Sequence, residues 1–167
     1  KGKIIGWFNG RSETGARALG NRSILADPRN KAMKDLLNKK IKYREEFRPF
    51  APAILEEKAE EYFETQGIKI PYMNCVVYAK KNKKNKIPAV VHVDGTSRLQ
   101  TVSKKMNPQF YRLIYEFGKI TNIPVLINTS FNLKGQPIVE TPRDAIMTFF
   151  GCGIDYLVLN SFLISKK

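Results

Sequence analysis

The apolar residues of this chain fall into short separate runs, and the order of those runs constrains the fold more than any other feature. Runs rich in β-branched and aromatic residues predict strands, whereas apolar residues three or four apart predict helices. The order is mixed, with too few regular β-α alternations for a doubly wound sheet or an α/β barrel. We therefore predict an α/β (α+β) fold, with a twisted mixed β-sheet flanked by helices. The predicted strands are residues 4–8, 72–79, 90–93, 99–102, 124–127 and 156–164; the predicted helices are residues 31–42, 54–64, 107–118 and 141–150; and residues 45–52, with two prolines, are a predicted rigid connector.

Length and composition favour one domain with anionic partners. With 167 residues and 43% apolar content, the chain can build one sizeable core, so residues 1–167 are predicted to form a single domain. The formal net charge of +14 indicates a nucleic acid, a membrane surface, a nucleotide or an acidic neighbouring domain. No run approaches the roughly 20 apolar residues that cross a bilayer, and no signal peptide is evident, so we expect a cytoplasmic protein. A start at Lys1 rather than Met predicts a fragment of a longer polypeptide.

The two cysteines and the single histidine do not form a metal-binding or redox motif. Cys75 and Cys152 lack C-x-x-C spacing, and only His92 could join them as a ligand. We expect both thiols to be free and buried, and we expect no metal site. Because no elbow-like serine accompanies His92, we predict a hydrogen-bonded strand residue rather than part of a catalytic triad.

Glycine and arginine are interleaved in residues 10–23, which follow the first predicted strand. Small residues let the backbone approach a ligand closely, and arginine offers a planar fork of donors for phosphate or carboxylate oxygens. Arg17 belongs to this segment, Lys42 and Arg44 stand at the end of the predicted helix 31–42, and Arg98 follows an Asp-Gly turn. These four cations are the candidate catalytic residues. The alternative for residues 10–23 is a solvated loop with scattered charges.

A polar cluster directly after the predicted strand 124–127 supplies the neutral half of the candidate site. Its amide and hydroxyl groups can bind a nucleotide, and its members are Asn128, Thr129, Ser130 and Asn132. If folding brings this cluster to Lys42 and Arg44, the two clusters form one cationic, hydroxyl-lined pocket for a nucleotide and a small phosphate.

The motifs that are absent narrow the reaction class. The sequence contains no G-x-x-x-x-G-K-[ST] loop and no G-x-G-x-x-G after a strand, so the two commonest nucleotide cradles are missing. The candidate cations have no paired carboxylates nearby and are poorly suited to general acid-base chemistry. Positioning and charge neutralisation supply most of the catalysis in phosphoryl or nucleotidyl transfer, which is the reaction class we predict.

Four segments carry a resemblance to a known family. They are GWFNGRSETGARALGNRSILADPR, KYREEFRPFAPA, VDGTSRLQTV and VLINTSFNLKGQPIVETPRDA. Over residues 5–164 the chain resembles the C-terminal domain of the O-carbamoyltransferase family, of the NodU and antibiotic carbamoyltransferase type. That domain is similar to the YrdC, or threonylcarbamoyl-adenylate synthase, fold. The K-x-R and S-x-N signatures of that fold match Lys42-x-Arg44 and Ser130-x-Asn132.

The resemblance implies that the chain binds ATP with Mg²⁺, takes carbamoyl phosphate as co-substrate and forms carbamoyl-adenylate, releasing pyrophosphate and phosphate. It implies that the K-x-R residues hold the carbamoyl and phosphate oxygens, and that the S-x-N residues bind the triphosphate or its magnesium ion. Arg17 and Arg98 would neutralise charge on the α-phosphate. The implied partner is an N-terminal, metal-carrying domain of the actin-like ATPase superfamily, absent from this sequence, which passes the carbamoyl group to an acceptor hydroxyl.

Two other functions stay open on the sequence alone. The charge and the lysine run at residues 80–86 allow a nucleic-acid-binding module of YrdC-like fold, although no stripe of stacking aromatics joins the basic residues. A non-catalytic docking domain, inert without its partner, would also carry a basic surface. Small-molecule substrates therefore rank above nucleic acid as partners, and no membrane partner is expected.

Overall fold

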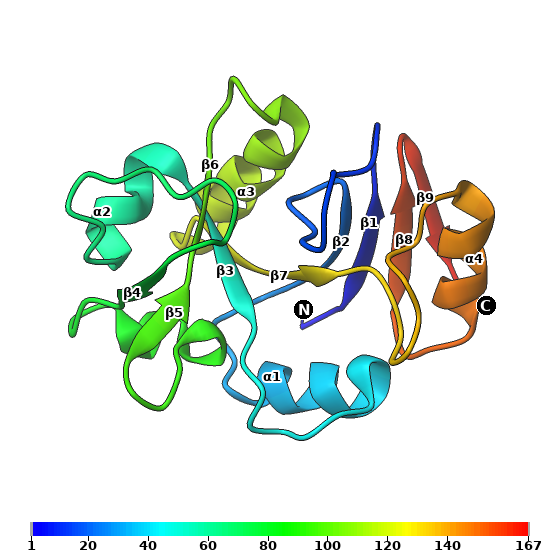
Figure 1. The fold of residues 1–167 in the computed structure, drawn as a ribbon, viewed down its shortest axis with the longest axis horizontal. Coiled ribbons are helices and arrows are strands. Elements are labelled where there is room, and N and C mark those ends of the chain that lie inside the picture. The colour runs from blue at the N-terminus through cyan, green and yellow to red at the C-terminus, as the bar shows by residue number, and fades with distance from the viewer. Residues whose placement is uncertain (1, 167) are drawn as a thin grey trace.

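The computed structural model describes residues 2–166 and places seven strands in one mixed β-sheet (Figure 1). The strand order is β6-β3-β7-β2-β1-β8-β9, with parallel pairing at β1–β8 and β3–β6 and antiparallel pairing elsewhere. Two further strands, β4 and β5, pair only with each other. The predicted class, a mixed sheet flanked by helices, is confirmed. The strands are β1 (Ile5–Phe8), β2 (Arg22–Ala26), β3 (Ala51–Leu55), β4 (Val76–Tyr78), β5 (Thr96–Arg98), β6 (Gln100–Val102), β7 (Val125–Ser130), β8 (Tyr156–Leu159) and β9 (Phe162–Ser165).

Two of the α-helices, α3 and α4, begin where the sequence carries start signals. In α3 the Asn107 side chain accepts a hydrogen bond from the Phe110 amide, and α4 opens with a reciprocal capping box between Thr141 and Asp144. The predicted helix 31–42 is also confirmed, as α1 and a π-helical turn that continues it. The bounds are α1 (Ala32–Leu37), its π-helical continuation (Asn38–Lys42), α2 (Ala59–Tyr62), α3 (Pro108–Thr121) and α4 (Pro142–Phe150), with 3₁₀ turns at Glu56–Lys58, Lys84–Lys86 and Pro88–Val90.

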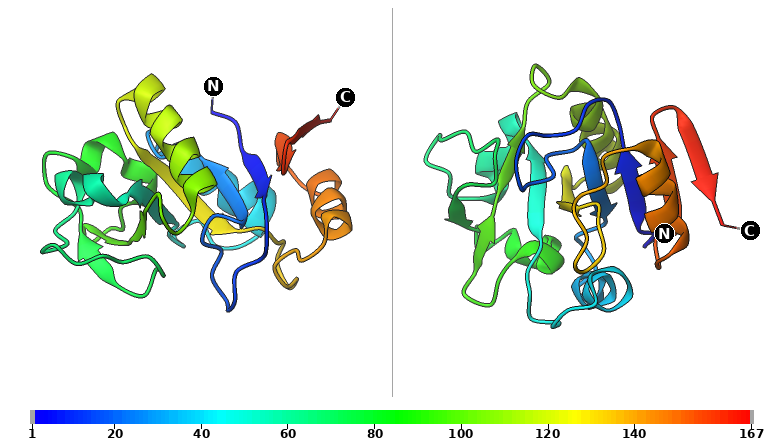
Figure 2. Two further views of the ribbon diagram at one scale, coloured as in Figure 1. Left: turned by 90° about the horizontal axis from the view of Figure 1, so that it is seen from above. Right: turned by 45° about the vertical axis from the view of Figure 1, so that its right-hand side comes forward.

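Side chains of β7 alternate between two hydrophobic cores, one on each face of the sheet. Val125 and Ile127 belong to the core that includes residues of α1 and α4, whereas Leu126 belongs to the core under α3. This two-residue period is that of a strand covered on both faces. Figure 2 shows α3 lying across one face of the sheet. The chain leaves the fully buried region at Thr129 and Ser130, the last two residues of β7, which belong to the polar cluster.

The prediction of an acidic helix over residues 54–64 is wrong in its first part. The chain there forms β3 (Ala51–Leu55), between β6 and β7, and becomes α-helical only at Ala59–Tyr62. Ala53 and Ile54 are fully buried and belong to the cores on opposite faces. Consecutive residues that point to opposite faces require a strand, so burial overrides the helix propensity of the glutamates that follow. The predicted connector 45–52 therefore ends inside β3.

The predicted strands on either side of the Asp-Gly turn are misplaced. The strand expected over residues 72–79 is reduced to β4, and its Val76 and Tyr78 side chains are exposed rather than core. Residues 90–93 form no strand, because Val90 ends a 3₁₀ turn. Residues 96–98, which lie between the predicted strands, form β5 instead, since Gly95 adopts φ of +85° and completes the reversal early.

Two other segments differ from their predicted secondary structure. The C-terminal strand expected over residues 156–164 is a hairpin of β8 and β9, with Asn160 in left-handed backbone at φ of 53°. The end of the glycine- and arginine-rich segment, expected to be loop, forms β2 and is buried along its length. Asn tolerates the left-handed backbone conformation that interrupts the C-terminal strand. The apolar residues on either side of it give no sign of this interruption.

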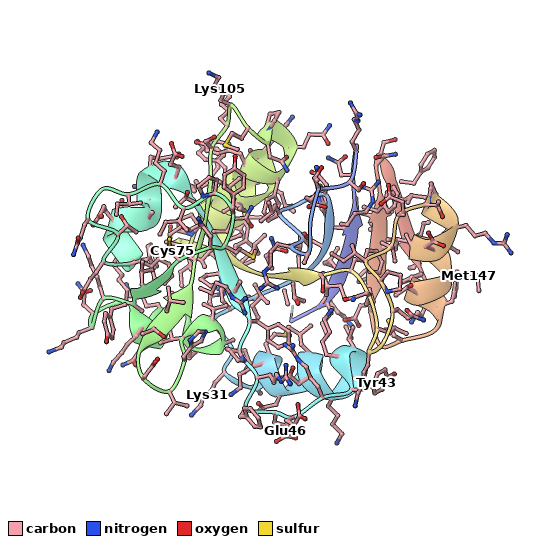
Figure 3. The ribbon with its side chains drawn as sticks, in the orientation of Figure 1. Lys31, Tyr43, Glu46, Cys75, Lys105 and Met147 are labelled. Carbon is pink, nitrogen blue, oxygen red and sulfur yellow. The ribbon has the colours of Figure 1, made fainter. Side chains whose placement is uncertain are left out.

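The prediction that both thiols are buried is wrong for Cys75. Its side chain is exposed, and it lies in the turn that leads to β4 (Figure 3). Cys152 is half-buried, and both thiols are free, as expected. Burial raises the pKa of the Cys152 thiol.

Candidate functional site

The side chain of Lys42 joins the end of the helical segment to the end of β7. Tyr43 follows Lys42 in left-handed backbone with φ of 45°, which ends the helical segment there (Figure 3). Lys42 Nζ donates to the backbone oxygens of Ser130 and Asn132 at 2.7 and 3.1 Å. It also lies 3.2 and 2.7 Å from their side-chain oxygens. The fold thus brings together the two polar clusters, which are 88 residues apart in sequence.

The environment of the Lys42 amine opposes its charge. Only 7% of the residue is exposed, and this burial, together with the positive charge of Arg44, lowers the pKa of Lys42 to about 7. The four oxygen acceptors act in the other direction, because an ammonium group offers three donors to them. Burial and the hydrogen bonds thus have opposite effects on the pKa of Lys42.

Beside this junction lies a cavity of about 130 Å³ whose wall is cationic. Three guanidinium groups, those of Arg17, Arg44 and Arg98, belong to residues of the wall, and no Asp or Glu does. Burial lowers the pKa of Arg44 and of Arg98, and the charge of Arg17 lowers that of Arg98 further. The full lining is Ala16, Arg17, Ala18, Arg44, Pro49, Phe50, Ala51, Met73, Arg98, Asn128, Thr129 and Ser130.

The cavity has the size and charge for a phosphate-like group. Its volume of about 130 Å³ exceeds what a single water molecule needs. Converging cations without counter-ions are unfavourable in a partly buried site unless an anion joins them. The cavity therefore suits a small anion or the phosphoryl part of a larger ligand, and it is too small to enclose a whole nucleotide.

The three arginines are held differently. Arg44 donates through Nε to Asn38 Oδ1 at 2.7 Å, and its guanidinium lies 4.9 Å from the centroid of the Phe50 ring. These contacts fix its plane. Arg17 and Arg98 make no side-chain hydrogen bond within residues 2–166, so their donors are free to meet a ligand.

Some neutral residues of the candidate site line the cavity, and another supports the residues that line it. Thr129 and Ser130 are half-buried and line the cavity. Asn128 also lines it, but only 1% of the residue is exposed, and its Nδ2 donates to Ala18 O and Gln100 Oε1. Neither Asn132 nor Lys42 is part of the cavity wall. Both contact Ser130, which is part of the wall. Six of the eight predicted site residues thus line one cavity and the other two support it.

Some lining and supporting residues were not predicted from the sequence. Met73 and the backbone around Pro49 complete the wall, and the sequence carries no signal for either. Gln100 holds Asn128 from β6, which follows from the position of the two strands rather than from any motif. Arg22, in the same glycine- and arginine-rich segment as Arg17, is 4% exposed and lies 3.5 Å over the Phe8 ring, outside the cavity.

Larger hollows lie elsewhere on the molecule. A groove of about 670 Å³ runs beside Trp7 and Arg112, and another of about 420 Å³ lies between α3 and β1. Neither contains any of the predicted site residues. Convergent polar groups identify the smaller cavity as the candidate site despite its size.

Other functional groups show no comparable arrangement. No cluster of three or more His, Cys, Asp and Glu side chains that could hold a metal ion occurs within residues 2–166. His92 is half-buried outside any strand, and its Nδ1 lies 3.0 Å from Thr96 Oγ1, so the expected hydrogen bond is present but the expected strand is not. Among the described helices, none has the length and apolar character needed to cross a bilayer.

Comparison with known proteins relates the whole chain to one family. The sequence profile described as Carbamoyltransferase C-terminus matches residues 1–166. Nodulation protein NolO of Bradyrhizobium diazoefficiens is 52% identical over 99% of the chain, and Nodulation protein U of Rhizobium tropici is 43% identical over 99%. An uncharacterised protein of Methanocaldococcus jannaschii is 46% identical over the full chain. The chain covers 31%, 28% and 27% of these three relatives, respectively.

Proposed function

The chain belongs to the carbamoyltransferase C-terminal family, and on that premise we propose that it activates a carbamoyl group as carbamoyl-adenylate. Its substrates are ATP and carbamoyl phosphate. The observation that carries the proposal is the phosphate-sized cavity with Arg17, Arg44 and Arg98 in its wall and no carboxylate. Such a wall favours an anion over a neutral ligand and supplies donors where charge develops in nucleotidyl transfer.

The proposed reaction needs little proton chemistry from the protein. Carbamoyl phosphate gives its phosphoryl group to water, leaving carbamate and phosphate. A carbamate oxygen then attacks the α-phosphorus of ATP, and the bond to pyrophosphate breaks, which yields carbamoyl-adenylate. The arginines of the cavity wall can offset the negative charge on the reacting oxygens throughout the reaction.

Each residue of the site has a place in this proposal. Arg17 and Arg98 would contact the α-phosphate, since their donors have no other partner within residues 2–166. Arg44 would hold a carbamoyl or phosphate oxygen. Ser130 would bind the triphosphate or its magnesium ion, and Lys42 would keep Ser130 in place through the contacts at 2.7 and 3.2 Å. Only part of the ATP would lie in the cavity, and the nucleoside would lie outside it, because about 130 Å³ is too small to enclose a nucleotide.

The transfer step belongs to the rest of a longer polypeptide. The chain covers 27% to 31% of the relatives described above, so an activating domain would need the remaining part to pass the carbamoyl group to an acceptor hydroxyl. We propose that this remaining part is an N-terminal, actin-like domain and that the whole protein is an O-carbamoyltransferase.

The test is exchange of labelled pyrophosphate into ATP by the full-length polypeptide. The proposal predicts exchange only when carbamoyl phosphate is present. Lys42→Ala and Ser130→Ala should both abolish it, whereas Lys39→Ala, an exposed lysine one turn earlier, should leave it unchanged. Normal exchange in both Lys42→Ala and Ser130→Ala would show that the assigned cavity is not the site.

A further inference from the structure

Glu13 closes the glycine- and arginine-rich loop by accepting backbone hydrogen bonds. Its Oε1 lies 2.6 Å from the amide nitrogen of Leu19, 2.7 Å from that of Asn21 and 3.4 Å from that of Arg22. One carboxylate oxygen therefore ties the start of the loop to its end. Charge-assisted hydrogen bonds of this kind are stronger than neutral ones.

Arg22 fixes the base of the same loop. Its Nη1 donates to the backbone oxygens of Asn9 and Gly10 at 3.1 and 3.0 Å, and its guanidinium lies over the Phe8 ring. The side chain is 4% exposed. Arg22 thus anchors the loop to β1 and β2, while Glu13 sets the path of the backbone beyond that anchor.

Arg17 stands within the segment that Glu13 closes. It is exposed and makes no side-chain hydrogen bond within residues 2–166, yet it lines the cavity. On its C-terminal side, Ala18 O accepts from Asn128 and Leu19 O accepts from Gln100. The path of the backbone that carries Arg17 is therefore set by contacts of the neighbouring residues, and Glu13 supplies the charged acceptor among them.

We infer that Glu13 is a positioning residue that holds Arg17 at the anion cavity. The identity of the anion as a substrate phosphate rests on the proposed function; the positioning itself does not. Electrostatics alone would give Glu13 the opposite effect, because a nearby negative charge repels an anion. The two roles consequently predict effects of opposite sign on anion affinity.

The test measures the affinity of the full-length polypeptide for inorganic pyrophosphate by titration calorimetry. Glu13→Ala removes the acceptor and should weaken binding about tenfold, the loss expected for one charge-assisted contact. Glu13→Gln keeps a carbonyl oxygen for the three amides and should stay within about twofold of the parent. Arg17→Ala should lose as much as Glu13→Ala, and the double variant should lose no more than either.

Hydrogen exchange supplies a readout that needs no ligand. Amides of residues 19–22 should exchange faster in Glu13→Ala than in the parent or in Glu13→Gln, since only the first lacks the acceptor. Glu13→Asp, whose side chain is one methylene shorter, replaces Glu13→Ala if that variant does not fold. It should lose part of the affinity for pyrophosphate and part of the protection of the amides from exchange.

Several results would overturn the inference. These are tighter pyrophosphate binding in Glu13→Ala, additive losses in the double variant, unchanged exchange at residues 19–22, parent-like behaviour of Glu13→Asp, and no pyrophosphate binding by the parent protein. Failure of the proposed function has a different outcome: pyrophosphate binding and its dependence on Glu13 would persist, but no carbamoyl-adenylate would form.

Discussion

Replacing Lys42 by methionine should change how the stability of the chain depends on pH. Burial lowers the pKa of Lys42 from 10.5 to about 7, so in the native state the amine loses its proton about 3.5 pH units earlier than in the unfolded chain. Between these two values the unfolded state binds more protons, and stability rises with pH. A methionine side chain has a similar volume and cannot titrate, and every other group is common to both proteins.

The magnitude follows from the linkage relation. A group with pKa of about 7 in the native state and about 10.5 in the unfolded state adds about 2 kcal/mol to the free energy of unfolding between pH 7 and pH 9. Lys42 is almost fully buried, so solvent screening scarcely reduces this figure. The expected sign follows from the lowered pKa: the parent gains stability relative to Lys42→Met as pH rises.

Urea unfolding of the two proteins at pH 7, 8 and 9, followed by circular dichroism, measures the difference directly. The free energies of unfolding should diverge by about 1 kcal/mol per pH unit in favour of the parent. Parallel curves would mean that the four oxygens around Nζ keep the pKa of Lys42 at its ordinary value. That result would contradict the lowering of this pKa by burial.

Three other outcomes follow from the structure. Gly20→Ala drives a Cβ into the ring of Phe110 at a backbone φ of +111° and should cost more than about 3 kcal/mol in the free energy of unfolding, whereas Gly15→Ala, with φ of +105° and open space, should cost about 1 kcal/mol. Cys75 should react with a thiol reagent much faster than Cys152, whose thiol is half-buried with a raised pKa; equal rates would contradict the burial. Single- and double-stranded nucleic acid should dissociate at moderate salt while ATP stays bound, and the reverse would favour the nucleic-acid module.

The sequence predicted the parts of the site that local signals define. Lys42 ends a helix with clear apolar spacing, and Ser130 follows a β-branched run, so both could be placed at the ends of elements. Their convergence across 88 residues was a hypothesis on composition, and the fold supplies the contact. The expectation that the chain uses ATP and carbamoyl phosphate comes from the family resemblance and not from the residues alone.

The parts that failed depend on tertiary contacts. Ala51–Leu55 is a strand because two cores cover it, which no local pattern near its prolines indicates. Arg17 and Arg22 are the same residue type five positions apart, yet one lines the cavity and the other lies over Phe8. Glu13 acts through backbone amides, whose directions depend on the path of the loop rather than on its composition.

The most direct test of the account is to follow α-labelled ATP in the full-length protein with carbamoyl phosphate and without an acceptor. Labelled carbamoyl-adenylate should accumulate, and Arg98→Ala should prevent it, because the cavity wall loses a guanidinium that has no side-chain hydrogen bond among residues 2–166. Label that stays in ATP, or that appears in ADP because only the γ-phosphoryl group moves, would contradict adenylate formation at this site.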